Sequence, residues 1–265
     1  PFLPGISATM AAFSRDGRGI AYTALPENTL WRCAADGAER LQLTTLPMQA
    51  ALPRWSPDGQ SIAFMGRLPG RPWKVYLLPS KGGKPNELFP GERNEADPDW
   101  SPDGMRLVFG GIPKLDGVEH NAIYVANLRT REIASLPGSG DYFSPRWSPD
   151  GRHLAALRSD GKTLVLYDFE SRRWSEWASL PEGAGYPAWS SKGEWLYLLH
   201  RPAAQSEIVR LRLRDGRPEV VASLKEIGQL PFIFGSWIGL TPAGEPLTVR
   251  DLSTQDIYAL EWQAP

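Results

Sequence analysis

The sequence predicts a closed six-bladed β-propeller of four-stranded antiparallel blades, an all-β fold that occupies residues 1–265 as a single domain. Three observations support this prediction: a turn motif that recurs six times, a spacing of 42 to 51 residues between copies, and the absence of sustained helical periodicity. A repeat of this length matches one four-stranded blade, and neighbouring blades bury each other's apolar faces. The glycines that close the six turns are Gly17, Gly59, Gly104, Gly151, Gly193 and Gly244.

The repeated motif has the residue types of a tight turn between two strands. Its full form, WSPDG, occurs at residues 55–59, 100–104 and 147–151, and the other three copies are degenerate. Proline presets φ, serine and aspartate bond the local backbone, and glycine takes a positive φ. The aromatic residue before the turn is expected to pack between neighbouring blades, and a β-type run such as SIAF at 61–64 follows.

Two further strands complete each predicted blade. The third strand is a β-type run such as KVYL at 74–77, and the fourth is shorter and more polar. The sixth repeat ends after its third strand, at Trp262, so we expect its outer strand to come from residues 2–5 and to close the ring. The fourth strands are predicted to end near Leu43, Leu88, Leu136, Leu180 and Leu224.

Composition excludes several classes of function. Lys and Arg total 29 against 30 Asp and Glu, so no basic excess favours nucleic-acid binding. The one cysteine, Cys33, forms no internal disulfide, and no Cys/His cluster predicts a metal or other cofactor. No run of about 18 apolar residues predicts a membrane span. The first residues lack the features of a signal peptide, so we expect any targeting or anchoring segment to lie upstream.

The repeats resemble the WD40-like PD40 family, which occurs in TolB and in the propellers of prolyl-oligopeptidase-type peptidases. Segments such as LPRWSPDGQSIAF, NEADPDWSPDG, FSPRWSPDGR and GLTPAGEPLTVRDLSTQDIYALEW are most similar to the C-terminal propeller of acidobacterial membrane-anchored winged-helix regulators. This resemblance implies an extracytoplasmic, periplasmic-side sensing or interaction domain of a larger signalling protein. The alternatives are a TolB-like periplasmic scaffold that binds proteins and, less favoured, the propeller of a hydrolase.

The loops at one face of the ring are the predicted binding site for a protein or small-molecule ligand. They join strand four to the next blade's strand one, or strand two to strand three, and surround the channel mouth. The candidate residues in these loops are Arg67, Arg71, Trp73, Asn94, Glu95, Asp97, His120, Asn121, Asp141, Tyr142, Tyr186, His200, Phe232 and Phe234.

Each candidate group has a structural alternative. Residues 94–97, with two carboxylates and an amide, could hold a cation, but an inter-blade hydrogen-bond network is the favoured interpretation. The Arg67 to Trp73 loop could clamp an anionic or aromatic ligand, with a solvated loop favoured instead. Phe232, Phe234 and Trp237 fit a partner patch and core packing equally well. The Gly-Ser-Gly run at 138–140 frees the backbone beside Asp141.

Catalysis is the least favoured function. The histidines, His120, His153 and His200, belong to different blades, and no HExxH or GxSxG motif is present. A nucleophile with a neighbouring base is not evident from the sequence. We therefore predict a non-catalytic binding domain.

Overall fold

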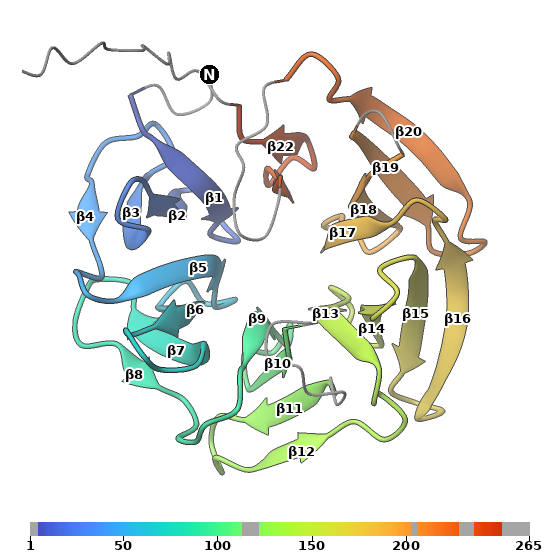
Figure 1. The fold of residues 1–265 in the computed structure, drawn as a ribbon, viewed down its shortest axis with the longest axis horizontal. Helices are drawn as coiled ribbons and strands as arrows, with labels where there is room; N and C mark the ends of the chain where they lie inside the picture. Colours follow the sequence, from blue (N-terminus) through green and yellow to red (C-terminus); the bar gives the residue numbers. More distant parts are fainter. Residues whose placement is uncertain (1–4, 113–121, 203–205, 228–235, 251–265) are drawn as a thin grey trace, which may run out of the picture.

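The computed structural model describes residues 5–112, 122–202, 206–227 and 236–250, and it is an all-β propeller (Figure 1). Five four-stranded antiparallel sheets surround a central axis, and the strands of each sheet follow chain order from the inside outward. No helix long and apolar enough to cross a membrane occurs in this part of the chain. The strands of the five sheets are β1 (Ala8–Phe13), β2 (Gly19–Ala24), β3 (Thr29–Ala34), β4 (Leu41–Gln42); β5 (Gln49–Trp55), β6 (Ser61–Arg67), β7 (Lys74–Pro79), β8 (Asn86–Glu87); β9 (Ala96–Trp100), β10 (Arg106–Gly110), β11 (Tyr124–Asn127), β12 (Ile133–Ser135); β13 (Tyr142–Trp147), β14 (His153–Arg158), β15 (Thr163–Asp168), β16 (Arg173–Ser179); and β17 (Ala184–Trp189), β18 (Trp195–His200), β19 (Glu207–Arg212), β20 (Pro218–Ser223).

The sixth repeat contributes a two-stranded sheet, β21 (Ile238–Leu240) and β22 (Pro246–Thr248), where six four-stranded blades were predicted. This sheet lies in the ring between the first and fifth sheets, and β21 contacts both β1 and β17 (Figure 1). The predicted third strand at 256–260 and the closing residues 2–4 lie outside the described residues. The structure therefore shows five complete blades, and closure by the N-terminal strand stays a prediction.

The fourth strands differ in length between the two halves of the ring. In the first three blades they have two or three residues, as the sequence predicts. In the next two blades, β16 has seven residues and β20 has six, so the prediction of a short fourth strand is wrong there. All residues of both long strands are exposed or half-buried, as expected for an outermost strand with one face in solvent.

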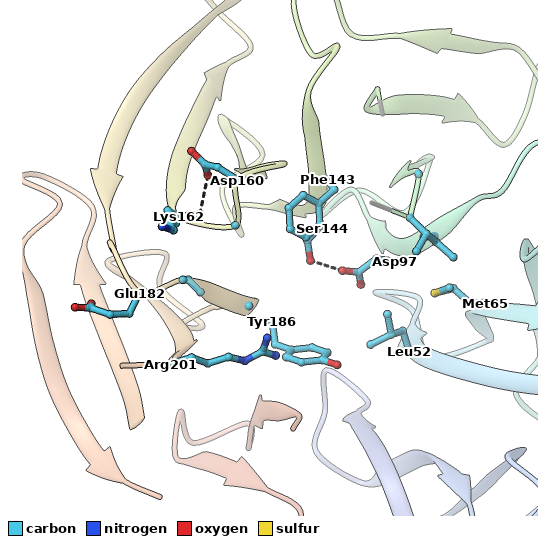
Figure 2. A pocket seen from close by; sticks show the side chains of 17 residues that line it. Leu52, Met65, Asp97, Phe143, Ser144, Asp160, Lys162, Glu182, Tyr186 and Arg201 are labelled. Atoms are coloured by element: carbon cyan, nitrogen blue, oxygen red, sulfur yellow. Dashed lines mark hydrogen bonds between the residues drawn. The ribbon is translucent and has the colours of Figure 1, made fainter. Parts of the chain in front are cut away.

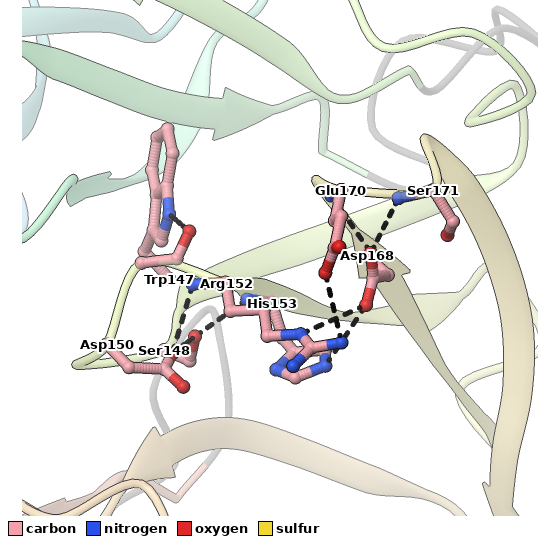
Figure 3. Close-up of polar contacts among 9 residues, drawn as sticks. Trp147, Ser148, Asp150, Arg152, His153, Asp168, Glu170 and Ser171 are labelled. Carbon is pink, nitrogen blue, oxygen red and sulfur yellow. Dashed lines mark hydrogen bonds and ion pairs between the residues drawn. The ribbon is translucent and has the colours of Figure 1, made fainter.

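The repeated turn forms a local hydrogen-bond unit. In the fourth repeat, Ser148 donates its hydroxyl hydrogen to Asp150 Oδ1 at 2.5 Å and accepts a bond from the His153 backbone N–H at 2.8 Å (Figure 3). The Asp150 carboxylate also accepts the backbone N–H of Arg152 at 3.0 Å. The same three bonds occur at 14–19, 56–61 and 101–106. The serine and aspartate of the motif thus satisfy each other and the turn backbone.

The aromatic residue before the turn joins neighbouring blades. The indole N–H groups of Trp55, Trp100 and Trp189 donate at 3.0 to 3.1 Å to a backbone carbonyl on the innermost strand of the preceding blade. Trp147 differs, because its indole bonds Gly151 in its own blade and its backbone N–H donates to Asp99 Oδ2 at 2.8 Å. The expected inter-blade packing is therefore accompanied by hydrogen bonds that set the register between blades.

Candidate binding site at the channel mouth

A bulge in each innermost strand directs one side chain toward the channel mouth. Leu52, Asp97, Ser144 and Tyr186 occupy the same repeat position, three residues before the tryptophan and directly before a proline. All four have a positive φ between 49° and 55°, and the strand register shifts at each of them. This backbone region is uncommon for residues other than glycine, and a bulge re-aims the side chain that it carries.

The four bulge residues line a pocket of about 370 Å³ that opens on this face of the ring (Figure 2). The pocket is bounded by strand-four-to-strand-one connections and by strand-two-to-strand-three connections, which are the two loop sets predicted to surround the channel mouth. Its volume falls in the range of small-molecule sites. The lining residues are Leu52, Met65, Ala96, Asp97, Gly111, Ile112, Phe143, Ser144, Asp160, Gly161, Lys162, Glu182, Gly183, Ala184, Gly185, Tyr186 and Arg201.

Asp97 is the charged residue at the channel side of the pocket, and its negative charge is neutralised by arginine. Arg146 donates from Nη2 to Asp97 Oδ1 at 2.6 Å, and the hydroxyl of Ser144 donates to Oδ2. Arg54 lies 3.8 Å from the same carboxylate. Asp97 and Arg146 are 7% and 3% exposed, so each buried charge depends on the other.

Asp99 and Arg54 interact with the same charges, and both have shifted pKa values. Burial raises the pKa of Asp99 although Arg146 and Arg54 oppose the shift. Burial and then repulsion by Arg146 lower the pKa of Arg54 to about 10. The two pKa shifts have opposite directions, but each favours the uncharged form of its group. This is the expected effect of removing ionisable groups from water.

Tyr186 forms one wall of the pocket and remains a neutral phenol. Burial raises its pKa, the Asp97 carboxylate raises it further, and Arg201 and Arg146 lower it. Figure 2 shows the guanidinium of Arg201 beside the Tyr186 ring, at the pocket edge. The tyrosine thus offers an aromatic surface to the pocket.

The outer rim of the pocket carries two carboxylates that already have partners. Asp160 accepts bonds from the Lys162 and Thr163 backbone N–H groups at 2.7 and 2.9 Å and from the Thr163 hydroxyl at 2.9 Å. Glu182 pairs with His200 Nε2 at 3.2 Å. On the other side of the His200 ring, Nδ1 lies 2.9 Å from Glu207.

The structure brings three of the predicted site residues together. Asp97 and Tyr186 line the pocket, and His200 contacts the lining residue Glu182 and directly precedes Arg201. Arg201 and Glu182, which also line the pocket, are not among the candidate residues named from the sequence.

Residues 94–97 take part in hydrogen bonds and ion pairs between neighbouring elements. Asn94 Oδ1 accepts the Trp73 backbone N–H at 2.9 Å. Glu95 binds the ammonium of Lys74 at 2.7 Å and accepts the backbone N–H of Val75 at 3.2 Å, and the two side chains are 1% and 2% exposed. Asn94 and Glu95 therefore hold the second blade to the start of the third.

The Arg67 to Trp73 loop lies outside the pocket. Arg67 stacks over the Trp73 ring at 4.8 Å and donates to Gln49 Oε1 at 2.8 Å. Trp73 is buried in the apolar core, and Arg71 is exposed at 4.0 Å from Glu92.

Asp141 and Tyr142 also contact their own blade rather than the pocket. The Ser159 hydroxyl and backbone N–H both donate to Asp141, and the Tyr142 ring packs edge-on against Trp174 at 4.7 Å.

Trp237 is buried beside Ile238 in the core. Four predicted site residues lie outside the described residues: His120, Asn121, Phe232 and Phe234.

Several pocket residues were not singled out from the sequence. Leu52, Phe143, Ser144 and Lys162 line the pocket but are not among the candidate residues. The signal for Leu52 and Ser144 was the X-Pro-X-Trp spacing shared with Asp97 and Tyr186. The signal for Lys162 was the Asp160-Gly161 turn, which is a strand-two-to-strand-three connection.

Comparisons with known proteins show the fold. The sequence matches no protein-family model and no curated protein. Similar solved structures include a putative TolB from Agrobacterium tumefaciens, with a TM-score of 0.70 and 19% identity over 92% of this chain and 89% of that one. An oligogalacturonate lyase in complex with manganese has a TM-score of 0.65 and 13% identity over 91% and 76% of the two chains. A chain of a nidogen/laminin complex has a TM-score of 0.67 and 12% identity over 83% and 82%.

The similar structures include both an enzyme and a protein complex, so the fold alone does not decide between catalysis and binding. Within the described ranges, no three His, Cys, Asp or Glu side chains converge as potential metal ligands. The function must therefore be argued from the pocket and its charges.

Proposed function

We propose that this chain is a non-catalytic binding domain that takes its ligand at the channel mouth. The observation that carries the proposal is the pocket formed by the four bulge residues, Leu52, Asp97, Ser144 and Tyr186. Strained backbone at equivalent positions of four blades, all turned toward one cavity, is a common feature of functional sites. Asp97, the buried carboxylate of this cavity, is paired with a buried arginine, which suits a structural role better than proton transfer.

The sequence resemblance supports a finer proposal, in which the domain is the extracytoplasmic sensing part of a larger regulator. Its alternative is a protein-binding scaffold, favoured by the similarity of fold to TolB. The open reading frame that encodes this chain distinguishes the two proposals, because the regulator requires a winged helix and a membrane helix upstream. The predicted lack of nucleic-acid binding accompanies both proposals and rests on the balanced charge.

We also propose that β21 and β22 are the inner half of a sixth blade. In the second, third and fourth repeats, the turn proline packs on the turn glycine of the following repeat. Pro242 has the same relation to Gly17, where an added Cβ would lie 3.1 Å from its Cγ. The sixth turn thus contacts the first as the second, third and fourth turns contact their successors. An experimental structure in which residues 256–260 do not pair with β22 would contradict this proposal.

A variant that fills the pocket tests the binding function. A Cβ added at Gly185 would meet only the far end of the Arg201 side chain, at 3.6 Å, so Gly185→Trp should insert its ring without backbone strain. Gly140 is the matched control, since it is exposed, has open space around it and lies outside the pocket.

The measurement is thermal unfolding in the presence of a library of small molecules and peptides, because a ligand that binds the native state raises its stability. Ligands of the pocket should stabilise the wild type and Gly140→Trp but not Gly185→Trp. If every stabilising ligand acts equally on all three proteins, the pocket is not the binding site.

A further inference from the structure

The exposed cations of the pocket and its apolar residues lie on opposite sides (Figure 2), and Asp97, the charged lining residue beside the apolar side, is paired with Arg146. Figure 2 shows Lys162, Glu182 and Arg201 on one side, and Leu52 and Met65 on the other. The apolar side is extended by Ile112 of the third blade. A ligand that fills this cavity must therefore present an apolar surface in one direction and a polar group in the other.

The carboxylates on the charged side are already occupied by intramolecular bonds. Asp160 accepts three hydrogen bonds from its own turn. Although burial alone would raise the pKa of Asp160, the bonds from Lys162 and Thr163 lower it below its usual value. Glu182 is paired with His200, and deeper in the pocket Asp97 is paired with Arg146. A cationic ligand would therefore share these oxygens with donors that already bind them.

The cations on the same side are not occupied in this way. Neither Lys162 nor Arg201 takes part in an ion pair with another described residue. Both are exposed, and they reach the rim from the strand-two-to-strand-three connections of two adjacent blades. Arg201 contributes a planar donor group that matches a carboxylate, and Lys162 contributes a mobile ammonium. Among the described residues, Lys162 and Arg201 are therefore the charged side chains of this rim that have no hydrogen-bond or ion-pair partner.

We propose that the pocket binds a small organic acid whose carboxylate lies between Lys162 and Arg201 and whose apolar body packs on Leu52, Met65, Ile112 and Phe143. This inference rests on the proposed binding function and deepens it by assigning the chemical class of the ligand. The ring of Tyr186 lines the pocket between Arg201 and Leu52 (Figure 2), so it would contact the ligand between its carboxylate and its apolar body. Both cations are exposed, so the preference for the acid would arise from two modest charge-assisted bonds that act together.

The test compares three probes that share an apolar body and differ in charge: 4-phenylbutyrate, 4-phenylbutan-1-ol and 4-phenylbutylamine. Calorimetric titration of the full chain near neutral pH should give the acid an affinity about 10-fold higher than the alcohol, with the amine weakest. Added salt should lower the affinity for the acid and leave the affinity for the alcohol unchanged.

Variants assign the preference to the two cations. Lys162→Gln and Arg201→Gln should each lower the affinity for the acid about 3- to 10-fold without changing that for the alcohol. The double variant should bind acid and alcohol within about 2-fold of each other. Arg71→Gln is the control, because Arg71 is an exposed arginine of another loop and does not line the pocket.

The outcomes separate this inference from the proposed function. If acid and alcohol bind equally and Gly185→Trp abolishes both, the pocket is a binding site but the acid inference is wrong. If the acid preference survives in the Lys162→Gln/Arg201→Gln double variant, or no probe binds at millimolar concentration, the inference is also wrong. If the acid binds Gly185→Trp as tightly as wild type, the site lies elsewhere and both proposals fail.

Discussion

The two ends of the innermost strands follow the repeat to very different degrees. At the turn end, serine occurs in five repeats and threonine in the sixth, and its side-chain oxygen accepts a backbone N–H in each. At the mouth end, the equivalent residues differ in size, charge and polarity. They are, in chain order, Met10, Leu52, Asp97, Ser144, Tyr186 and Trp237.

This difference shows which positions the backbone constrains. A tight turn requires particular hydrogen bonds and one positive φ, so only a few residue types are suitable. A bulge at the mouth requires only that the strand be offset, and the side chain it presents is free to vary. One face of the ring is therefore set by the fold, and the other is available for binding specificity.

The largest expected effect on stability is at the mouth, where Asp97 forms an ion pair with buried Arg146. Asp97→Ala removes the partner of buried Arg146 and should lower the free energy of unfolding by about 3–5 kcal/mol. Urea unfolding measures this loss. Replacing both residues, as Asp97→Ala with Arg146→Met, should restore much of the stability because no unpaired charge remains.

This variant also separates structure from binding at the mouth. We would expect Asp97→Ala to weaken ligand binding through loss of folded protein, whereas Gly185→Trp acts in the folded state. An unfolding free energy within about 1 kcal/mol of the wild type would show that the Arg146 charge is compensated by other groups.

A smaller effect is expected at the turn end, and it should depend on how complete the motif is. Ser101 donates to Asp103 Oδ1 at 2.5 Å and accepts from the Arg106 backbone N–H at 2.9 Å. Ser101→Ala should therefore cost about 1–2 kcal/mol. In the fifth repeat Lys192 stands where the motif has aspartate, and Ser190 accepts only the longer bond from Trp195 N–H at 3.1 Å.

Ser190→Ala should accordingly cost about half as much as Ser101→Ala. Thermal unfolding of the two single variants provides the comparison, and their effects should be additive in the double variant because the turns are in different blades. Equal losses of stability in the two variants would mean that the hydrogen bond between serine and aspartate does not stabilise the turn.

The sequence was sufficient to predict the features that depend on local backbone geometry. The turn glycines, the strands after them and the tryptophans between blades all follow from short segments whose residue types allow few conformations. The face that carries the pocket could also be predicted, because connection topology alone places both sets of loops there. The long outer strands β16 and β20 could not, since nothing in their polar sequences sets where pairing ends.

The site residues were harder to predict because their roles depend on partners from other blades. Glu95 and Asp97 are both acidic residues of one short loop, yet one pairs with Lys74 of the preceding blade and the other with Arg146 of the following blade. Trp73 lies in a Pro/Gly-rich segment typical of an exposed loop but is buried in the core. Such distinctions arise from tertiary contacts about 20 to 50 residues apart in sequence.

The smallest effect concerns pH, and it should have opposite signs for two aspartates of the third repeat, Asp103 in the turn and Asp99 in the strand before it. The Ser101 hydroxyl and the Met105 backbone N–H lower the pKa of Asp103 from its usual value of 3.8, whereas burial raises the pKa of Asp99. Charged Asp103 therefore stabilises the fold above its unfolded pKa, and this contribution is lost as the pH falls through the lowered native value. Charged Asp99 destabilises the fold, and this cost disappears as the pH falls through its raised native value.

Asparagine variants measure these signs directly, because asparagine lacks the titrating charge but keeps an oxygen acceptor. At neutral pH, Asp103→Asn should unfold at a lower temperature than the wild type, and Asp99→Asn at the same or a higher temperature. The Asp99→Asn difference should shrink as the pH falls from neutral through the raised native pKa of Asp99, whereas the Asp103→Asn difference should persist until the pH falls below about 3.8 and shrink only there. If Asp99→Asn instead unfolds at a lower temperature at neutral pH, the attraction of Arg146 and Arg54 outweighs burial, and charged Asp99 stabilises the fold as the turn aspartates do.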